Sequence, residues 1–167
     1  LDPDILRMMQ QLPMLDSMAY LRTVVSAMGL LDATAEQLDP SNLRQQAVSL
    51  IAKTPTLIAT AERLRRKQPM LGPRQDLGHA ANFLYMLHGE EPQASHTEAL
   101  DAYLVLLAEH GFNASTFAAR TTVATQSDMY SGVVAATHSP STLALLRALE
   151  AAPQHRVGEE AKSGRSD

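Results

Sequence analysis

The sequence contains no cysteine. This absence excludes a disulfide framework, a thiol nucleophile and thiolate metal ligands within the chain. It is compatible with a reducing compartment, and we expect a cytoplasmic protein. The chain starts at Leu1-Asp2-Pro3-Asp4, with neither an initiator Met nor the basic segment of a signal peptide. We therefore expect it to begin inside a longer protein.

Long apolar runs and a basic excess are also missing. No stretch approaches the roughly 20 apolar residues that span a bilayer. The net charge of −4 argues against a general nucleic-acid binder. The one basic run, residues 63–67, lies where we expect a helix to end, so it can compensate the helix dipole. Neither nucleic acid nor a membrane is an expected partner.

The histidines do not form a metal-site pattern. His79 lies beside alanines and is expected to pack in the core, whereas His88 and His96 flank a loop and should be solvated. None of the histidine spacings matches a metal-binding motif, so we expect no metal and no cofactor.

What is abundant favours helix. Leu, Ala and Met supply most of the apolar side chains, and all three are good helix formers. No segment alternates apolar and polar residues as a half-buried strand would. The sequence therefore predicts an all-α, multi-helical bundle.

Periodicity and capping residues predict where the first helices lie. One covers residues 5–12, and a second covers Ser17–Leu31 with Ser17 as its N-cap. A third carries Leu43, Ala47, Leu50 and Ile51 on one face, and a separate helical stretch begins near Pro55 and ends in the basic run. Asp76 is expected to cap a helix that stops at Gly89.

Two apolar stretches follow. The helix from Thr97 to Glu109 is apolar nearly all round, which is typical of a helix buried in a core or an interface. The stretch Ala114–Ala136 contains fourteen small Ala, Ser, Thr or Gly residues. Small residues let helices approach closely, so we expect a central helix that is wrapped by others.

The end of the chain has a different composition. Residues 1–136 form the predicted helical unit, and residues 137–152 form a short divergent helical segment opened by Ser139-Pro140-Ser141. Residues 153–167 contain too few apolar side chains to offset the entropy of ordering, which predicts a disordered tail.

The turn between the two apolar stretches is the candidate site. Gly111 favours a helix end at His110, and Asn113 or Ser115 can cap the next helix. His110 would then lie at the negative end of one helix dipole, beside the positive end of the next. This arrangement could bind a dicarboxylate. The alternative is that His110 only caps its own helix.

Four blocks in this order resemble the citrate synthase family. The turn block is similar to the family pattern (D/E)-H-x-x-N-A-S-T-F-x-A-R, and the others resemble its L-R-T-x-x-S-x-x-G block, its D-L-S-x-A-A-N-F-L-Y-M-L block and the continuation after the turn. The residues that carry the resemblance are Glu109–Arg120, Leu21–Gly29, Asp76–Leu87 and Ser127–Ala136.

The resemblance implies the large, all-α domain of an enzyme that condenses acetyl-CoA with oxaloacetate to give citrate and CoA. It also implies a homodimer. His110 matches a family histidine that helps to hold oxaloacetate, and Asn113 could support that turn. Propionyl-CoA, the substrate of 2-methylcitrate synthases, is the alternative acyl donor.

Several family features are missing from this sequence. A glycine-rich loop that carries a catalytic His would follow Ala136, but His138 lacks the surrounding glycines, and His155 lies in the polar tail. The family's catalytic Asp and carboxylate-binding arginines belong to later segments. We therefore assign no catalytic residue. The rival hypothesis is a non-catalytic, truncated helical remnant that serves as a scaffold or dimerisation domain.

Overall fold

The computed structural model describes residues 1–13, 16–108, 111 and 113–137. These residues form seven α-helices and no strand, which confirms the all-α prediction. The short helical segment predicted within residues 137–152, apart from Thr137, and the tail at 153–167 lie outside the described residues. In chain order the helices are α1 (Pro3–Gln11), α2 (Ser17–Leu31), α3 (Pro40–Arg65), α4 (His79–His88), α5 (Ala94–Leu107), α6 (Ala114–Ala124) and α7 (Met129–Ala136).

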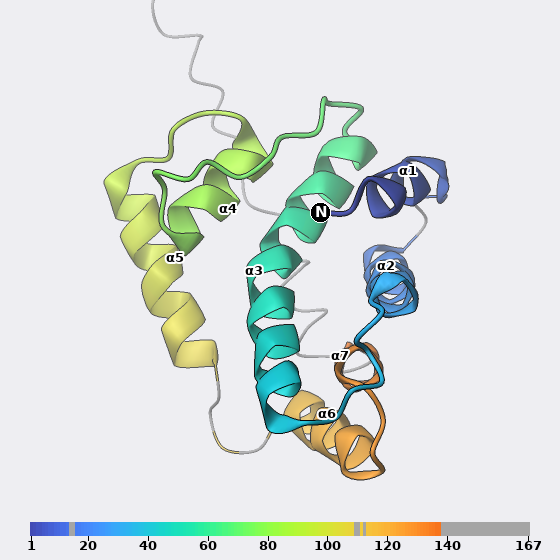
Figure 1. Ribbon diagram of the computed structural model, residues 1–167. Helices are drawn as coiled ribbons and strands as arrows, with labels where there is room; N and C mark the ends of the chain where they lie inside the picture. Colours follow the sequence, from blue (N-terminus) through green and yellow to red (C-terminus); the bar gives the residue numbers. More distant parts are fainter. Residues whose placement is uncertain (14–15, 109–110, 112, 138–167) are drawn as a thin grey trace, which may run out of the picture.

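Helix α3 is the long axis of the arrangement, with α1 and α2 on one side, α4 and α5 on the other, and α6 and α7 near its first turns (Figure 1). The sequence predicted two helical pieces separated near Pro55, and this prediction was wrong. Pro55 lies inside one continuous helix of 26 residues. Leu50 and Leu57, on either side of the proline, are buried in the same apolar cluster, so packing offsets the lost backbone hydrogen bond.

Side-chain caps fix several helix starts, but two of the predicted capping residues, Ser17 and Asp76, are not the caps in the structure. Asp16, rather than Ser17, caps α2 by accepting a hydrogen bond from the Ala19 N–H at 2.7 Å. Asp76 caps no helix, because its carboxylate pairs with Arg74 and α4 begins only at His79. The predicted end of α4 is confirmed, with Gly89 in the left-handed conformation at a φ of 87°.

The main core lies between α1, α2, α3 and α7, and a smaller cluster forms under α4. Val24 and Val25 of α2 are 0% and 1% exposed. Two expected core positions are wrong. Ile51 is 66% exposed, because α3 turns a different face inward, and His79 is exposed as the first residue of α4. The smaller cluster contains Ala59, Phe83, Met86 and Leu87.

Helix α7 joins this core through a close contact with α2. A Cβ on Gly29 would lie 3.0 Å from the Tyr130 Cβ and Cγ atoms, so a larger residue there would require the tyrosine to shift. The Tyr130 hydroxyl donates a hydrogen bond of 2.7 Å to the Asp32 carboxylate, just after α2. A segment 98 residues further along the chain is thereby attached to the first half of the fold.

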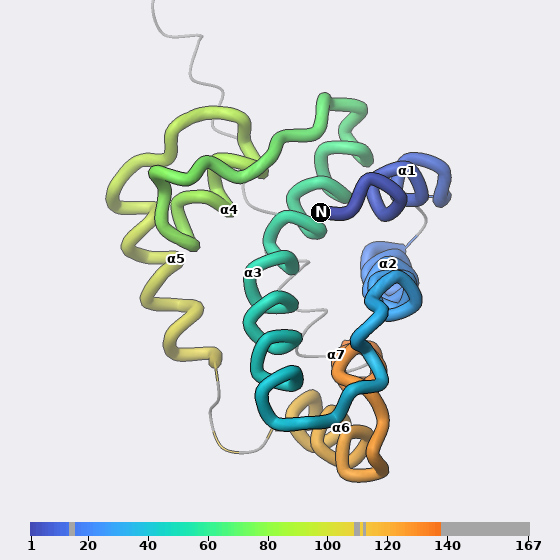
Figure 2. The backbone as a smooth tube through the Cα atoms, in the orientation of Figure 1, coloured from blue at the N-terminus to red at the C-terminus, as the bar shows by residue number. Residues whose placement is uncertain are grey.

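The two apolar stretches are arranged differently from the prediction. Residues 114–136 form two helices, α6 and α7, rather than one central helix, and α6 has no buried residue. Helix α5 also has none. Val105 and Leu106 are 69% and 72% exposed, and α5 contributes only the partly buried Leu100 to the smaller cluster under α4 within the described residues. Figure 2 shows α5 at the outer edge of the fold.

Candidate functional site

The candidate site is the segment between α5 and α6. Helix α5 ends at Leu107, three residues before the predicted end at His110. His110 itself lies outside the described residues. Gly111 has a φ of 107°, a conformation that L side chains rarely adopt, so glycine is required at this position. Helix α6 begins at Ala114, as the capping pattern predicted.

Asn113 fixes the start of α6. Its side-chain oxygen accepts a hydrogen bond of 2.8 Å from the Thr116 N–H, and its backbone oxygen accepts one of 2.9 Å from Phe117. Of the two predicted caps, Asn113 is therefore the one that the structure confirms. Because the positive end of a helix dipole lies at its N-terminus, the α6 start favours an anion nearby.

Helix α7 sets the position of α6. A Cβ on Gly132 of α7 would lie 2.7 Å from the Val123 Cγ2 atom of α6, so the two helices pack as closely as a glycine allows. Asp128 caps α7 by accepting a hydrogen bond of 2.9 Å from the Ser131 N–H. The pair formed by Tyr130 and Asp32 also has shifted pKa values. Desolvation raises the pKa of Tyr130, and the hydrogen bond from the Tyr130 hydroxyl lowers the pKa of Asp32.

The basic run is organised by burial and ion pairing, which sequence reasoning missed. Arg63 is only 6% exposed, and its Nε donates to the Pro69 carbonyl at 2.5 Å. Its Nη1 also reaches the Leu87 carbonyl at the end of α4, at 3.4 Å. Arg65 and Arg66 both pair with Glu62. The basic run lies at the end of α3, where the sequence placed it. Arg63, however, does not simply compensate the helix dipole, because its hydrogen bonds connect α3 to the end of α4.

The three histidines that the structure describes, His79, His88 and His96, lie on the surface. His88 and His96 are exposed, as predicted. Desolvation, followed by the nearby Arg66 charge, lowers the His88 pKa. Over the described ranges, no group of three or more His, Cys, Asp or Glu side chains could hold a metal ion. Within the same ranges, none of the helices combines the length and apolarity that a bilayer crossing needs.

The model of the family described as "Citrate synthase, C-terminal domain" matches residues 1–144. The chain belongs to the citrate synthase family. It is 49% identical over 119 residues to "Citrate synthase 2" of Bacillus subtilis, covering 71% of this chain and 32% of the relative. The chain therefore spans about a third of the length of the curated relatives it matches.

Solved structures agree in fold. The citrate synthase of Pyrobaculum aerophilum superimposes with a TM-score of 0.77 at 35% identity, over 90% of this chain and 42% of that one. The citrate synthase of Thermoplasma acidophilum gives a TM-score of 0.76 at 26% identity, over 83% of this chain and 36% of that one. That structure is a ternary complex with carboxymethyl coenzyme A and oxaloacetate.

The capping role of Asn113 can be measured. We expect Asn113→Ala to lower the free energy of unfolding by about 1 kcal/mol, because the Thr116 N–H loses its side-chain acceptor. Asn113→Ser, which keeps an acceptor, should lose only a fraction of that. Urea unfolding followed by circular dichroism measures both variants. Equal losses in the two variants would show that the side-chain cap does not stabilise α6.

Proposed function

We propose that this chain forms part of a citrate synthase and provides its oxaloacetate-binding turn. The enzyme joins the methyl carbon of acetyl-CoA to the ketone carbon of oxaloacetate, and water then cleaves the thioester to give citrate and CoA. Membership of the family supports this proposal, and the Thermoplasma acidophilum relative was solved with oxaloacetate and a CoA analogue.

The observation that carries the proposal is the geometry at the start of α6. Asn113 caps the helix at the position where the family pattern has its Asn, three residues after His110. A helix N-terminus attracts carboxylates, and a histidine beside it can donate a hydrogen bond to the same anion. We infer that His110 holds oxaloacetate and that Asn113 keeps the turn in place.

The chemistry requires further groups. A carboxylate must remove the α-proton of the acyl-CoA, and a histidine must hydrogen-bond the thioester oxygen. The glycine-rich loop and the later family segments that supply these groups are absent from this sequence. We therefore propose a binding role for this chain, and its cytoplasmic location stays a prediction from the absence of cysteine.

The role of His110 is tested in the enzyme that carries this chain together with those segments. We expect His110→Ala to raise the KM for oxaloacetate about tenfold or more, because the substrate loses one charge-assisted hydrogen bond. The KM for acetyl-CoA should not change. Release of free CoA thiol measures both values, with propionyl-CoA assayed in parallel as the alternative acyl donor.

His96→Ala is the matched control, because His96 is exposed on α5 and is assigned no role. An unchanged KM for oxaloacetate in His110→Ala would mean that His110 only caps its own helix. The purified chain assayed in the same way distinguishes an enzyme from a scaffold. Thiol release above background would contradict the binding-only role, and no release would support it.

A homodimer is the second part of the proposal. Tyr103, Val105, Leu106 and Leu107 of α5 are between 40% and 72% exposed, and Phe117 of α6 is 55% exposed. An exposed apolar surface of this kind marks an interaction site. Because the family resemblance implies a homodimer, we propose that a second copy of the chain covers α5.

We expect a dimer at micromolar concentration by size-exclusion chromatography with light scattering. Leu106→Asp should shift the chain to monomer, because it would place a charge in the apolar interface. Leu38→Asp changes an apolar residue that is 37% exposed outside α5 and should leave the dimer intact. A monomeric wild type, or equal effects of the two variants, would contradict this interface.

A further inference from the structure

Helix α6 is covered on one side only. It packs mainly against α7, and none of its residues is buried. Its side chains are mostly small or apolar, and Arg120 is its only charged residue. Figure 1 shows α6 and α7 together at one end of the fold. A helix of this composition is typically covered by other elements, so the pair presents an apolar surface that a further element could cover.

A groove of about 400 Å³ lies between α6 and α7. The two helices meet at its floor, because a Cβ on Gly132 would lie 2.7 Å from the Val123 Cγ2 atom. Apart from Arg120, the residues that line the groove are apolar or small, namely Ala119, Val123, Ala124, Met129, Gly132 and Val133. Ala124 is exposed, and Met129 and Val133 are only partly buried. The groove therefore suits the apolar side chains of another element.

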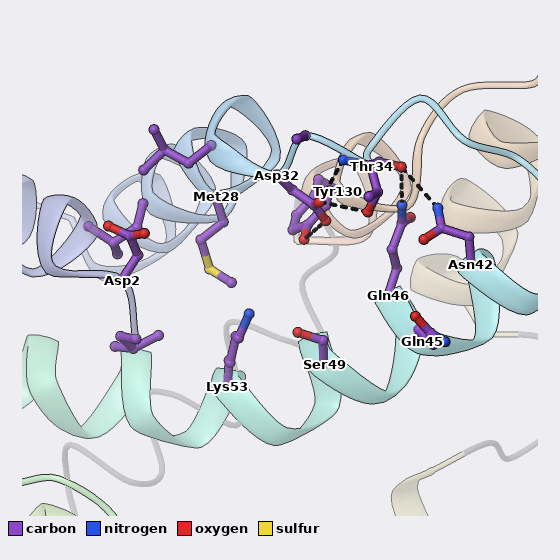
Figure 3. Close-up of a pocket in the computed structure, with 14 residues that line it drawn as sticks. Asp2, Met28, Asp32, Thr34, Asn42, Gln45, Gln46, Ser49, Lys53 and Tyr130 are labelled. Carbon is purple, nitrogen blue, oxygen red and sulfur yellow. Dashed lines mark hydrogen bonds between the residues drawn. The ribbon is translucent and has the colours of Figure 1, made fainter.

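The groove lies on a different side of α7 from the contact with α2. That contact is made by Tyr130, whose hydroxyl donates to the Asp32 carboxylate at 2.7 Å (Figure 3). Met129, Val133 and Ala136 are spaced by four and three residues, so they form a stripe along α7. Tyr130 lies about 100° around the helix from Met129. A further helix can therefore pack on this stripe without displacing the tyrosine.

The sequence that follows α7 contains a candidate for this helix. The family model matches the chain only as far as residue 144, and three leucines lie just beyond this point. Leu145, Leu146 and Leu149 would share one face of a helix, because residues three and four apart are neighbours. Arg147 and Glu150 would lie away from that face. This pattern is typical of a helix that packs through one apolar side.

The connection from α7 to this segment is short. Helix α7 ends at Ala136, and Ser139 followed by Pro140 is a typical helix start, which leaves three residues between the two helices. Helices joined by so short a connection pack as antiparallel neighbours. The second helix would then run back along α7 toward Met129. From Pro140 to Ala152 it would be about 20 Å long, against about 12 Å for α7, so it could cover the whole groove.

We propose that residues 140–152 form an amphipathic helix that docks into the groove between α6 and α7. In the antiparallel arrangement Leu145 lies near Val133, and Leu149 lies near Ala124, at the end of the groove where α6 leads into α7. The chain thus covers this surface with its own segment, in place of a later segment of the family. The interaction does not depend on the proposed reaction.

The absence of cysteine allows a direct test in the full chain. Ala124→Cys together with Leu149→Cys introduces the only two thiols. We expect mild oxidation to join them within one chain, because a disulfide forms only where the two Cβ atoms approach to about 4 Å. Ala124→Cys with Leu143→Cys is the matched control, since Leu143 would lie on the same side as Arg147. Its disulfide should form at least tenfold more slowly.

Thermal unfolding of the full chain provides a second measurement. We expect Leu149→Ala to lower the midpoint by about 5 °C or more, because a leucine buried in the groove is lost. Leu143→Ala makes the same truncation on the other side of the helix and should lower the midpoint by about 2 °C or less. Circular dichroism measures both midpoints and confirms that the cysteine variants are folded.

Three results would overturn the proposal. The first is equal rates of disulfide formation in the Leu149→Cys and Leu143→Cys pairs, which would place the segment outside the groove. The second is a disulfide product found only at the mass of two chains on a denaturing gel, which would mean that a second copy fills the groove. The third is an equal thermal midpoint for Leu149→Ala and Leu143→Ala, because neither side of the helix would then be buried in preference to the other.

Discussion

The contact between Tyr130 and Asp32 connects the two ends of the described fold. The tyrosine comes from α7 and the carboxylate from the loop after α2, and they meet in a hydrogen bond of 2.7 Å. Tyr130 is only 4% exposed and packs against Gly29, where a larger residue would crowd the tyrosine. Since α6 packs mainly against α7, the position of α6 relative to α2 and α3 depends on this contact.

The position of the candidate site also depends on the contact between Tyr130 and Asp32. Asn113 caps α6, α6 packs against α7 through Gly132, and Tyr130 attaches α7 to the core. The proposed oxaloacetate-binding turn is thus held at its α6 end by a chain of packed elements rather than by a surface loop alone.

Local chemistry explains which parts of the fold could be predicted from the sequence. Helix α2 has the predicted bounds, and α4 stops at Gly89, because glycine readily adopts the left-handed conformation that ends a helix. Asn113 was recognised because a side-chain acceptor is preferred at an N-cap. The family resemblance rested on ordered blocks, and the match over residues 1–144 confirms it.

The wrong predictions concern tertiary packing. Pro55 stays inside α3 because Leu50 and Leu57 are buried on both sides of it, which a local rule does not include. Arg63 is buried because two carbonyls far apart in sequence accept from it. The exposed face of α5 could not be predicted for a similar reason. An apolar composition indicates that a helix is covered, but it does not identify what covers it.

The most direct test of this account is the stability of Tyr130→Phe as a function of pH. The variant keeps the ring beside Gly29 and removes only the hydroxyl. Because the hydroxyl lowers the Asp32 pKa in the fold, its contribution is complete above the unfolded-state pKa of a carboxyl. It is lost as the pH falls through the lower folded-state value. Tyr85→Phe on α4, which keeps the ring beside the Arg74 guanidinium and lies outside the proposed dimer surface, is the matched control.

We predict that Tyr130→Phe loses about 1 kcal/mol of unfolding free energy at pH 7 in urea denaturation. This difference from the wild type should shrink as Asp32 becomes protonated, and Tyr85→Phe should match the wild type at every pH. Wild-type stability of Tyr130→Phe at pH 7 would contradict the account. It would mean that the hydrogen bond between α7 and the end of α2 does not hold the described fold together.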